Sequence, residues 1–278
     1  MSGGKFDLHG KVGLVTGAGA NGGLGHAMAV GLAEAGADVA VSDIDAAGAA
    51  TTGREIEALG RRTAVIICDN ARREQIVAMF AAVDSAFGRI DILINNVGAG
   101  ARYRPEELPY EEWQRVLDIS LSSSFLCAVE AGHRMIAQGG GGSIVNISSI
   151  ASSHALGRGN LPHSVAKSGV NALTRELAVE WGPHGIRVNA ILPATIRTAA
   201  WDTISRTMDW DYDAWERQLL SGLPLGRLGV PDDLVGPAVF LASDASAFVT
   251  GHLLAVDGGN LALDAGGSIA WPALRTDR

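Results

Sequence analysis

Short runs of apolar residues, many of them β-branched, alternate along the chain with longer segments in which apolar residues recur at helical spacing. Runs such as VGLVTG, AVIIC and ILIN are apolar at nearly every position, which is typical of parallel strands covered by helices on both faces. The pattern predicts strands at residues 11–16, 38–42, 63–68, 90–95, 143–148, 187–192 and 253–257. It predicts helices at residues 24–35, 74–87, 112–137, 164–181 and 231–243.

This alternation predicts an α/β protein with a doubly wound Rossmann fold, in which seven parallel strands are flanked by helices on both sides. No Pro-rich or charged linker divides the sequence, so we expect residues 1–278 to form a single domain. Ligands of such sheets bind at the carboxyl ends of the strands. Candidate chemistry is therefore sought in the segments that follow each predicted strand.

Composition narrows the class of protein. Apolar residues make up 47% of the chain, yet no run approaches the roughly 20 residues of a membrane span. The first residues lack the apolar core of a signal peptide, so we expect a cytoplasmic protein that does not bind membranes. A net charge of -8 without a basic stripe argues against nucleic-acid binding. Cys68 and Cys127 lie in apolar stretches and are expected to be reduced, and no His or Cys spacing indicates a metal site.

A glycine-rich segment, TGAGANGGLG at residues 16–25, links the first predicted strand to the first helix. Glycines at this point let backbone N–H groups approach a pyrophosphate at the positive end of the helix. The second strand is followed by Asp43, where a carboxylate can accept hydrogen bonds from the adenosine ribose. A 2′-phosphate would be repelled by Asp43, and the next residues, Ile44 and Asp45, supply no cation. The sequence therefore favours NAD over NADP.

Further motifs follow the later strands: Cys68-Asp69, Asn95-Asn96-Val97-Gly98, Ile147-Ser148-Ser149, the helix of Lys167, Pro193 with Ile196 and Thr198, and Val256-Asp257-Gly258-Gly259. With these motifs, the chain from about residue 7 to 260 resembles the short-chain dehydrogenase/reductase family. The resemblance implies cofactor contacts with the adenine, both riboses, the pyrophosphate and the nicotinamide carboxamide. These residues are Gly17, Asn21, Gly23, Leu24, Gly25, Asp43, Ile44, Asp69, Asn70, Asn95, Gly98, Lys167, Pro193, Ile196 and Thr198.

The chain departs from the family pattern at several positions. Five residues separate Gly17 from Gly23, where the family usually has about three, so the loop is expected to bulge and to present Asn21 or Gly22. The resemblance implies that Ser149 holds the substrate oxygen and that Lys167 binds the nicotinamide ribose. His163 stands where the family has a catalytic tyrosine. Ser120 stands where the family has an asparagine that supports a proton-relaying water.

Three interpretations of His163 remain open. In the first, it is the acid/base of a redox enzyme, because a neutral imidazole with a pKa near 6.5 is already a competent base. Lys167, one helical turn away, is expected to lower that pKa further. In the second, the fold performs lyase, dehydratase or isomerase chemistry. In the third, the protein is a catalytically degenerate scaffold. The retained Ser149 and Lys167 favour the first interpretation, an NAD-dependent interconversion of a secondary alcohol and a ketone.

The substrate side is predicted from the segment at residues 194–226, which the resemblance identifies as a flap over the substrate. Its aromatic residues include Trp201, Trp210 and Trp215, which favour a bulky apolar or aromatic or cyclic small molecule. His154, in the loop before His163, is a further candidate substrate contact.

Assembly is predicted from the resemblance and from small apolar helix faces that include Ala128, Ala131 and Val170. A homotetramer or homodimer is implied, with the helices at residues 112–137 and 164–181 forming one interface. The tail at residues 261–278 is expected either to be disordered or to cover a neighbouring subunit's pocket.

Overall fold

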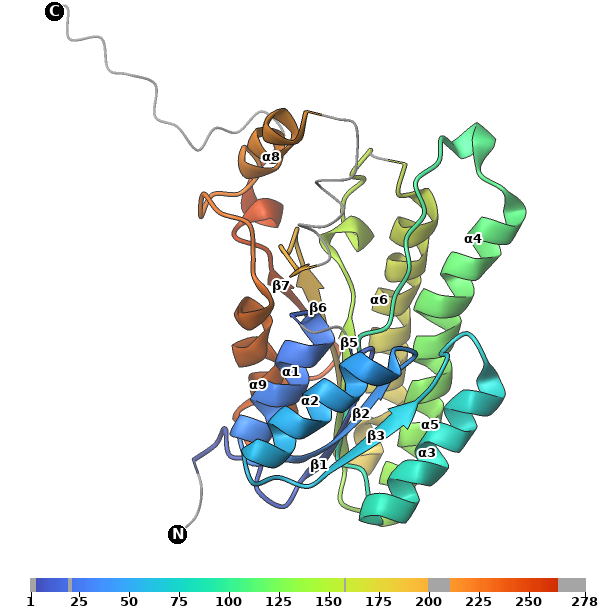
Figure 1. The fold of residues 1–278 in the computed structure, drawn as a ribbon, viewed down its shortest axis with the longest axis vertical. Coiled ribbons are helices and arrows are strands. Elements are labelled where there is room, and N and C mark those ends of the chain that lie inside the picture. Colours follow the sequence, from blue (N-terminus) through green and yellow to red (C-terminus); the bar gives the residue numbers. More distant parts are fainter. Residues whose placement is uncertain (1–3, 20–21, 158, 200–210, 265–278) are drawn as a thin grey trace, which may run out of the picture.

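The computed structural model describes residues 4–19, 22–157, 159–199 and 211–264. Within them, seven parallel strands form one sheet in the order β3-β2-β1-β4-β5-β6-β7, which confirms the predicted doubly wound fold (Figure 1). The strands are β1 (Val12–Thr16), β2 (Asp38–Asp43), β3 (Thr63–Ile67), β4 (Ile92–Asn95), β5 (Gly142–Ile147), β6 (Ile186–Pro193) and β7 (Leu253–Val256). The strand order reverses between β1 and β4, which is where such a sheet opens a crevice for ligands.

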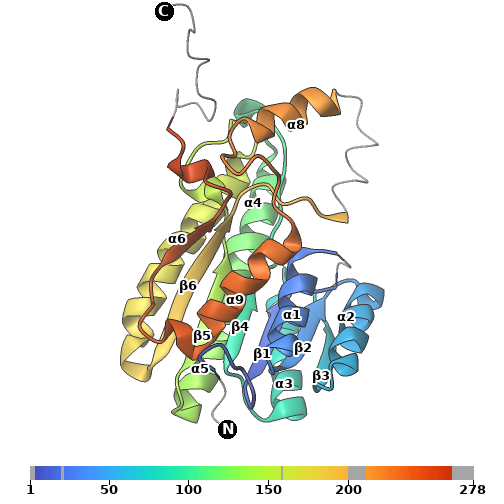
Figure 2. The same cartoon turned by 90° about the vertical axis from the view of Figure 1, so that its left-hand side faces the viewer.

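Helices cover both faces of this sheet. Helices α1 (Leu24–Glu34), α2 (Ala46–Ala58) and α9 (Val235–Ala242) pack on one face through a core that includes Met28, Leu32 and Leu241. Figure 2 looks onto this face. Helices α3 (Arg73–Phe87), α5 (Ser123–Gln138) and α6 (Leu161–Trp181) pack on the other face around Phe80 and Met135. Burial on both faces explains why the central strands β1 and β4 are buried at every position. The edge strand β3 differs from the expectation, because its Val65 and Ile67 side chains are exposed.

Helix α2 is missing from the sequence prediction. Its sequence, AAGAATTGREIEA, carries few large apolar residues, so a helical apolar stripe is hard to recognise. A start signal is nevertheless present, because the Asp45 carboxylate accepts a hydrogen bond from the Ala47 N–H. The helix lies against the glycine-rich segment, since a Cβ atom at Gly48 would be 1.6 Å from the carbonyl oxygen of Gly19.

Two predicted helices differ from the structure in ways that affect the site. The helix predicted at residues 112–137 consists of α4 (Tyr110–Leu117), a π-helical turn (Asp118–Ser122) and α5. Helix α6 begins at Leu161, three residues before the predicted start, because Pro162 is well suited to the first turn of a helix. His163 therefore belongs to the first turn of α6 and Lys167 to the second.

The predicted flap is described in part. Helix α8 (Tyr212–Leu220) lies beyond the carboxyl ends of the strands, and Trp215 and Leu219 belong to a small apolar cluster with Leu223 and Leu228 (Figure 1). Trp201 and Trp210 lie outside the described residues, as does the tail from residue 265. Among the described residues, no helix combines the length and the apolar character that a membrane span requires.

The expected subunit faces need one correction. Ala128 and Ala131 are completely buried in the core beneath α5, and Val170 is buried beneath α6. These residues pack within the chain, so the prediction that they contact another subunit is wrong. Exposed apolar side chains on the two helices are instead Phe125 of α5 and Leu161, Val165 and Val179 of α6.

Candidate active site

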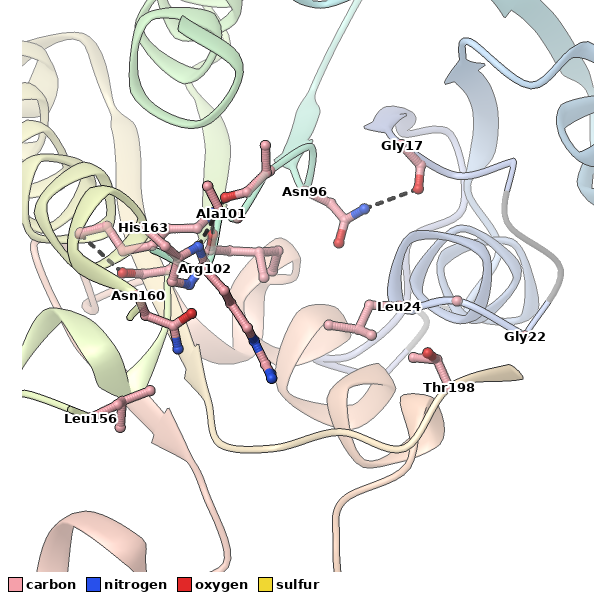
Figure 3. Close-up of a pocket in the computed structure, with 17 residues that line it drawn as sticks. Gly17, Gly22, Leu24, Asn96, Ala101, Arg102, Leu156, Asn160, His163 and Thr198 are labelled. Atoms are coloured by element: carbon pink, nitrogen blue, oxygen red, sulfur yellow. Dashed lines mark hydrogen bonds between the residues drawn. The ribbon is translucent and has the colours of Figure 1, made fainter. Parts of the chain in front are cut away.

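A cleft of about 730 Å³ lies at the carboxyl ends of β1, β4 and β5 (Figure 3). The loops after these strands and the first two turns of α6 form its walls. Its lining includes six of the predicted cofactor residues, Gly17, Gly23, Leu24, Gly98, Lys167 and Thr198, together with His163. The structure thus brings the predicted cofactor segments and the substituted histidine into one cavity.

The glycine-rich segment is held by close backbone contacts. A Cβ atom at Gly25 would lie 2.2 Å from the carbonyl oxygen of Gly17, so only glycine permits this approach of helix to loop. The Asn96 amide donates hydrogen bonds to the carbonyl oxygens of Thr16 and Gly17, at 3.1 and 3.0 Å. Sequence reasoning missed Asn96, although its place beside Asn95 at the end of a strand was a signal. This geometry fits the approach of a pyrophosphate at the start of α1.

Asp43 connects β2 to the glycine-rich segment. Its two carboxylate oxygens accept hydrogen bonds from the N–H groups of Gly19, at 2.8 Å, and Asp45, at 2.9 Å. Each oxygen keeps a further lone pair that a ribose hydroxyl can use. Asp43 also lines a side pocket of about 330 Å³, whose described walls contain Asp69 but no Lys or Arg. The acceptors and charges at this end fit an adenosine without a 2′-phosphate.

The residues predicted beside the adenine and the ribose differ in their surroundings. Ile44, Asp69 and Asn70 line the same side pocket as Asp43, and the buried Oδ1 of Asn70 has no partner within the described structure. Asn95 is buried and donates hydrogen bonds to Asn146 Oδ1, at 2.9 Å, and to the Ser124 carbonyl oxygen. Asn95 therefore braces β4 against β5 and α5, and its predicted contact with the ribose stays a prediction.

The segment after β6 reaches the cleft only in part. Thr198 lines the cleft, whereas Ile196 lies in a separate small pocket and pairs with Gly229. Pro193 ends β6. Asn21, expected in the bulge of the glycine-rich loop, lies outside the described residues, while its neighbour Gly22 lines the cleft with a positive φ of 73°.

Lys167 is a buried cation at the centre of the cleft. Its side chain donates a hydrogen bond to the Ile147 carbonyl oxygen at 2.7 Å. Burial lowers the pKa of its ammonium group from 10.5 to about 8, because removal from water disfavours the charged form. A Cβ atom at Gly98 would lie 3.1 Å from Lys167 Nζ, so the loop after β4 passes directly over the ammonium group.

His163 is oriented by a main-chain carbonyl. Its Nδ1 atom lies 3.1 Å from the carbonyl oxygen of Ala99. A carbonyl oxygen only accepts hydrogen bonds, so Nδ1 carries the proton and Nε2 of the neutral ring keeps a lone pair. Burial lowers the pKa of His163, and the charge of Lys167 lowers it further, against an opposing effect of the hydrogen bond to Ala99. The ring is therefore neutral at pH 7, with Nε2 able to accept a proton.

The other predicted catalytic residues are two serines. Ser120, in the π-helical turn, is completely buried and bonded to the backbone of Ala99. Ser149 Oγ accepts a hydrogen bond from the Ala151 N–H at 3.1 Å, which leaves the hydroxyl proton for another acceptor. Ser149 is absent from the lining of the cleft, whereas its neighbour Ser148 belongs to it. The Ser148 hydroxyl is engaged by Asn171 Oδ1, at 2.7 Å, so it has a structural partner already.

The substrate end of the cleft contains residues that sequence reasoning missed. Arg102 extends from the loop after β4 into the cleft, alongside Asn160 and Leu156 (Figure 3). A cation in a loop that follows a central strand was the available signal for Arg102. His154 is exposed and does not line the cleft, and its predicted substrate contact stays a prediction. Among the described residues, no group of three or more His, Cys, Asp or Glu side chains is placed to hold a metal ion.

Comparison with known proteins identifies the relatives of this chain. Residues 17–260 match the family model described as enoyl-(acyl carrier protein) reductase. The 2-dehydro-3-deoxy-D-gluconate 5-dehydrogenase of Escherichia coli (strain K12) is 40% identical over 258 residues, covering 92% of this chain and 98% of that protein. The D-threitol dehydrogenase of Mycolicibacterium smegmatis (strain ATCC 700084 / mc(2)155) is 38% identical over 258 residues, covering 91% of this chain and 94% of that protein.

Solved structures agree in fold. A short-chain type dehydrogenase/reductase from Mycobacterium marinum superposes with a TM-score of 0.82 at 34% identity, over 92% of this chain and 97% of that chain. A gluconate 5-dehydrogenase from Burkholderia cenocepacia J2315, solved in complex with NADP and tartrate, gives a TM-score of 0.85 at 33% identity. That match covers 94% of this chain and 98% of the other.

Proposed function

Because the chain belongs to the short-chain dehydrogenase/reductase family, we propose that it interconverts a secondary alcohol and a ketone with NAD, and that His163 is the acid/base. The observation that carries this proposal is the 3.1 Å hydrogen bond between His163 Nδ1 and the Ala99 carbonyl oxygen. It directs the proton to Nδ1 and keeps the Nε2 lone pair for the substrate. Burial keeps the ring neutral, which is the form that a base requires.

In the proposed oxidation of the alcohol, His163, Ser149 and Lys167 have different roles. Nε2 of His163 accepts the proton of the substrate hydroxyl, and the resulting imidazolium is stabilised by the Ala99 carbonyl oxygen. Ser149 is the proposed donor to the substrate oxygen, because its Oγ accepts a hydrogen bond from the Ala151 N–H and keeps its own proton; its side chain is not part of the cleft wall and would have to turn towards the substrate. Lys167 keeps a positive charge close to the ring and favours return of the proton from His163. NAD, when bound, supplies the nicotinamide ring that accepts the hydride.

The preference for NAD rests on the surroundings of Asp43. A 2′-phosphate at this position would meet the Asp43 carboxylate, and the described walls of the side pocket offer no Lys or Arg to neutralise it. A related gluconate 5-dehydrogenase was solved with NADP, so the fold does not exclude a 2′-phosphate, and the proposed preference for NAD rests on the charge at Asp43.

Two classes of substrate are supported by different observations. The predicted bulky apolar or cyclic substrate rested on three tryptophans, of which only Trp215 is described, and Trp215 packs against Leu219 and its neighbours. Arg102, in contrast, extends into the cleft (Figure 3), and a guanidinium is the side-chain group best suited to recognise a carboxylate. The relatives act on a sugar acid and a sugar alcohol by name. We therefore favour a hydroxylated carboxylic acid, with the cyclic or aromatic alcohol as the second candidate.

The test is NADH absorbance followed over a panel of hydroxy acids, polyols, and cyclic and aromatic alcohols. We expect turnover with hydroxy acids, and Arg102→Ala should raise KM for them by about tenfold or more while leaving neutral polyols little affected. Turnover confined to cyclic or aromatic alcohols, unchanged by Arg102→Ala, would favour the second candidate. A lyase, dehydratase or isomerase predicts product without net NADH formation, and a scaffold predicts neither.

We also propose that the protein assembles as a homotetramer or homodimer. Phe125 and Val179, which are exposed in the single chain, provide apolar surface on α5 and α6. Light scattering after size-exclusion chromatography should give a mass of two or four chains, and Phe125→Glu should reduce it. A monomeric wild-type protein at micromolar concentration contradicts the proposal.

A further inference from the structure

Hydrogen bonds to the N–H and the carbonyl oxygen of Ala99 connect the π-helical turn to His163. The Ala99 N–H donates a hydrogen bond to Ser120 Oγ at 2.9 Å. The Ser120 hydroxyl donates in turn to the Ala99 carbonyl oxygen at 3.3 Å. The same carbonyl oxygen accepts the hydrogen bond from His163 Nδ1. Ser120 therefore holds both polar groups of the residue that orients the imidazole.

The position of Ser120 in the fold directs its hydroxyl group towards Ala99. Its side chain is completely buried, in the π-helical turn between α4 and α5. Its own carbonyl oxygen accepts a hydrogen bond from Ser124 Oγ at 3.0 Å. A Cβ atom at Gly98 would be 3.8 Å from Ser120 Oγ and 3.1 Å from Lys167 Nζ, so serine and lysine approach the same loop from two helices. The Ser120 hydroxyl proton is committed to Ala99, which leaves none to pass to a water.

We infer that Ser120 is a positioning residue that acts through the Ala99 carbonyl to fix His163 in the tautomer with its proton on Nδ1. A rotated or displaced Ala99 peptide would release Nδ1, and the ring could then place its proton on Nε2, where it cannot act as a base. This inference rests on the proposed function only for its consequence in catalysis. The tautomer itself is a property of the protein without cofactor.

The inference also explains why two unusual residues occur together. A longer side chain at position 120, such as the family's asparagine, would displace Ala99, because Ser120 already sits within 2.9 Å of the Ala99 nitrogen in a fully buried site. A shift of the Ala99 carbonyl would change the position of His163. We therefore expect Ser120 and His163 to behave as an energetically coupled pair.

The decisive experiment is ¹⁵N NMR of the histidine rings in the cofactor-free protein near pH 8, with the His163 signals assigned by their loss in His163→Gln. The wild-type spectrum should show a protonated Nδ1 and an unprotonated Nε2. Ser120→Ala should produce a mixture of tautomers, and Ser120→Thr, which keeps the hydroxyl, should restore the wild-type pattern. The matched control is Ser122→Ala, because Ser122 lies in the same turn and its hydroxyl bonds Asp118 instead of Ala99.

Kinetics supply the second readout. Ser120→Ala should lower kcat by about tenfold with KM for NAD unchanged within about twofold, whereas Ser122→Ala should leave both near wild type. In a double-mutant cycle, Ser120→Asn should impair the wild-type enzyme yet improve His163→Tyr.

A wild-type His163 protonated on Nε2, or a tautomer unchanged in Ser120→Ala, overturns the inference. If either result is found while His163→Ala abolishes turnover, the proposed function stands without Ser120. If His163→Ala keeps full turnover, the proposed function fails, although the Nδ1 tautomer remains measurable.

Discussion

The two ends of the cleft are built from different kinds of contact. At the cofactor end, the main chain provides most of the geometry: Gly25 lies against Gly17, and the Asp43 carboxylate binds the Gly19 N–H. At the catalytic end, the buried Lys167 and the partly buried His163 hydrogen-bond through their side chains to the carbonyl oxygens of Ile147 and Ala99. A change at the cofactor end disturbs the fold of the loop. A change at the catalytic end should alter the proposed proton transfer within an intact fold.

The largest expected effect belongs to the catalytic end. His163→Ala should lower kcat by about 100- to 10,000-fold, because the base is removed from the site. Affinity for NAD, measured by fluorescence titration, should change by less than about threefold, since the cofactor contacts are elsewhere. His163→Gln is the shape-matched comparison and should be equally inactive. Turnover that survives in either variant would remove His163 from the chemistry.

Substitution of Lys167 tests whether a residue of the catalytic end lowers the stability of the folded protein. Burial lowers the pKa of its ammonium group to about 8, so at pH 7 the folded protein carries an unfavourable buried charge. Lys167→Met should therefore have a free energy of unfolding, measured in urea, that is higher by about 2 kcal/mol once the lost hydrogen bond to Ile147 is subtracted. The variant should be inactive. The exposed Lys5→Met serves as control.

The stability gain of Lys167→Met has a defined pH dependence. Between about pH 8 and 10.5 the unfolded wild-type chain binds the lysine proton while the folded chain has lost it, so wild-type stability rises with pH. The advantage of the variant should shrink over this range. An advantage that is constant from pH 7 to 10 would mean that the amine is not the source of the difference.

At the cofactor end, single substitutions should change preference more than activity. Asp43→Ser should shift the ratio of NAD to NADP affinity by about tenfold or more towards NADP, because a carboxylate that repels the 2′-phosphate is removed. Ile44→Arg should add to the shift, and Ile44→Leu should have no effect. Titration with both cofactors provides the measurement. Equal binding of NAD and NADP by the wild type would contradict the assignment of Asp43.

The smallest expected effect is the contribution of His163 to acid stability. Its pKa is lowered in the folded protein, chiefly by burial, so below pH 6.5 the unfolded chain binds the proton more readily. The stability that the neutral His163 ring contributes above pH 6.5 is lost as the pH falls from 6.5 through the pKa of His163 in the folded protein. As pH falls below 6.5, the free energy of unfolding of the wild type, measured in urea, should therefore decrease relative to that of His163→Gln. Parallel curves would show that the folded ring is not shielded from protonation.

The comparison of the two ends also shows what a sequence can predict. Glycines and a carboxylate at strand ends are typical of a nucleotide site, so Gly17, Gly25 and Asp43 could be predicted from the sequence, and the structure shows the close packing of these segments. The carbonyl of Ala99 could not be found, because every residue has one and only the fold selects which faces the imidazole. The π-helical turn was likewise hidden within a continuous helical pattern.

Other differences arise from packing. A small residue such as Ala128 is compatible with either a subunit contact or a tightly packed core, so the sequence does not distinguish the two. In the structure Ala128 lies in the core. Arg102 was overlooked because an isolated cation in a loop usually belongs to the solvated surface, whereas here it extends into the cleft.

The proposed role of His163 depends most directly on the pKa of its imidazole. We would measure the pH dependence of kcat/KM for alcohol oxidation in the wild type and in His163→Tyr, since this ratio reports the ionisation of the free enzyme. The wild type should lose activity only below the ordinary histidine pKa of 6.5, and His163→Tyr should shift that limb to a higher pH. An acid limb above pH 7 in the wild type, or the same limb in both proteins, would contradict a buried neutral imidazole as the base.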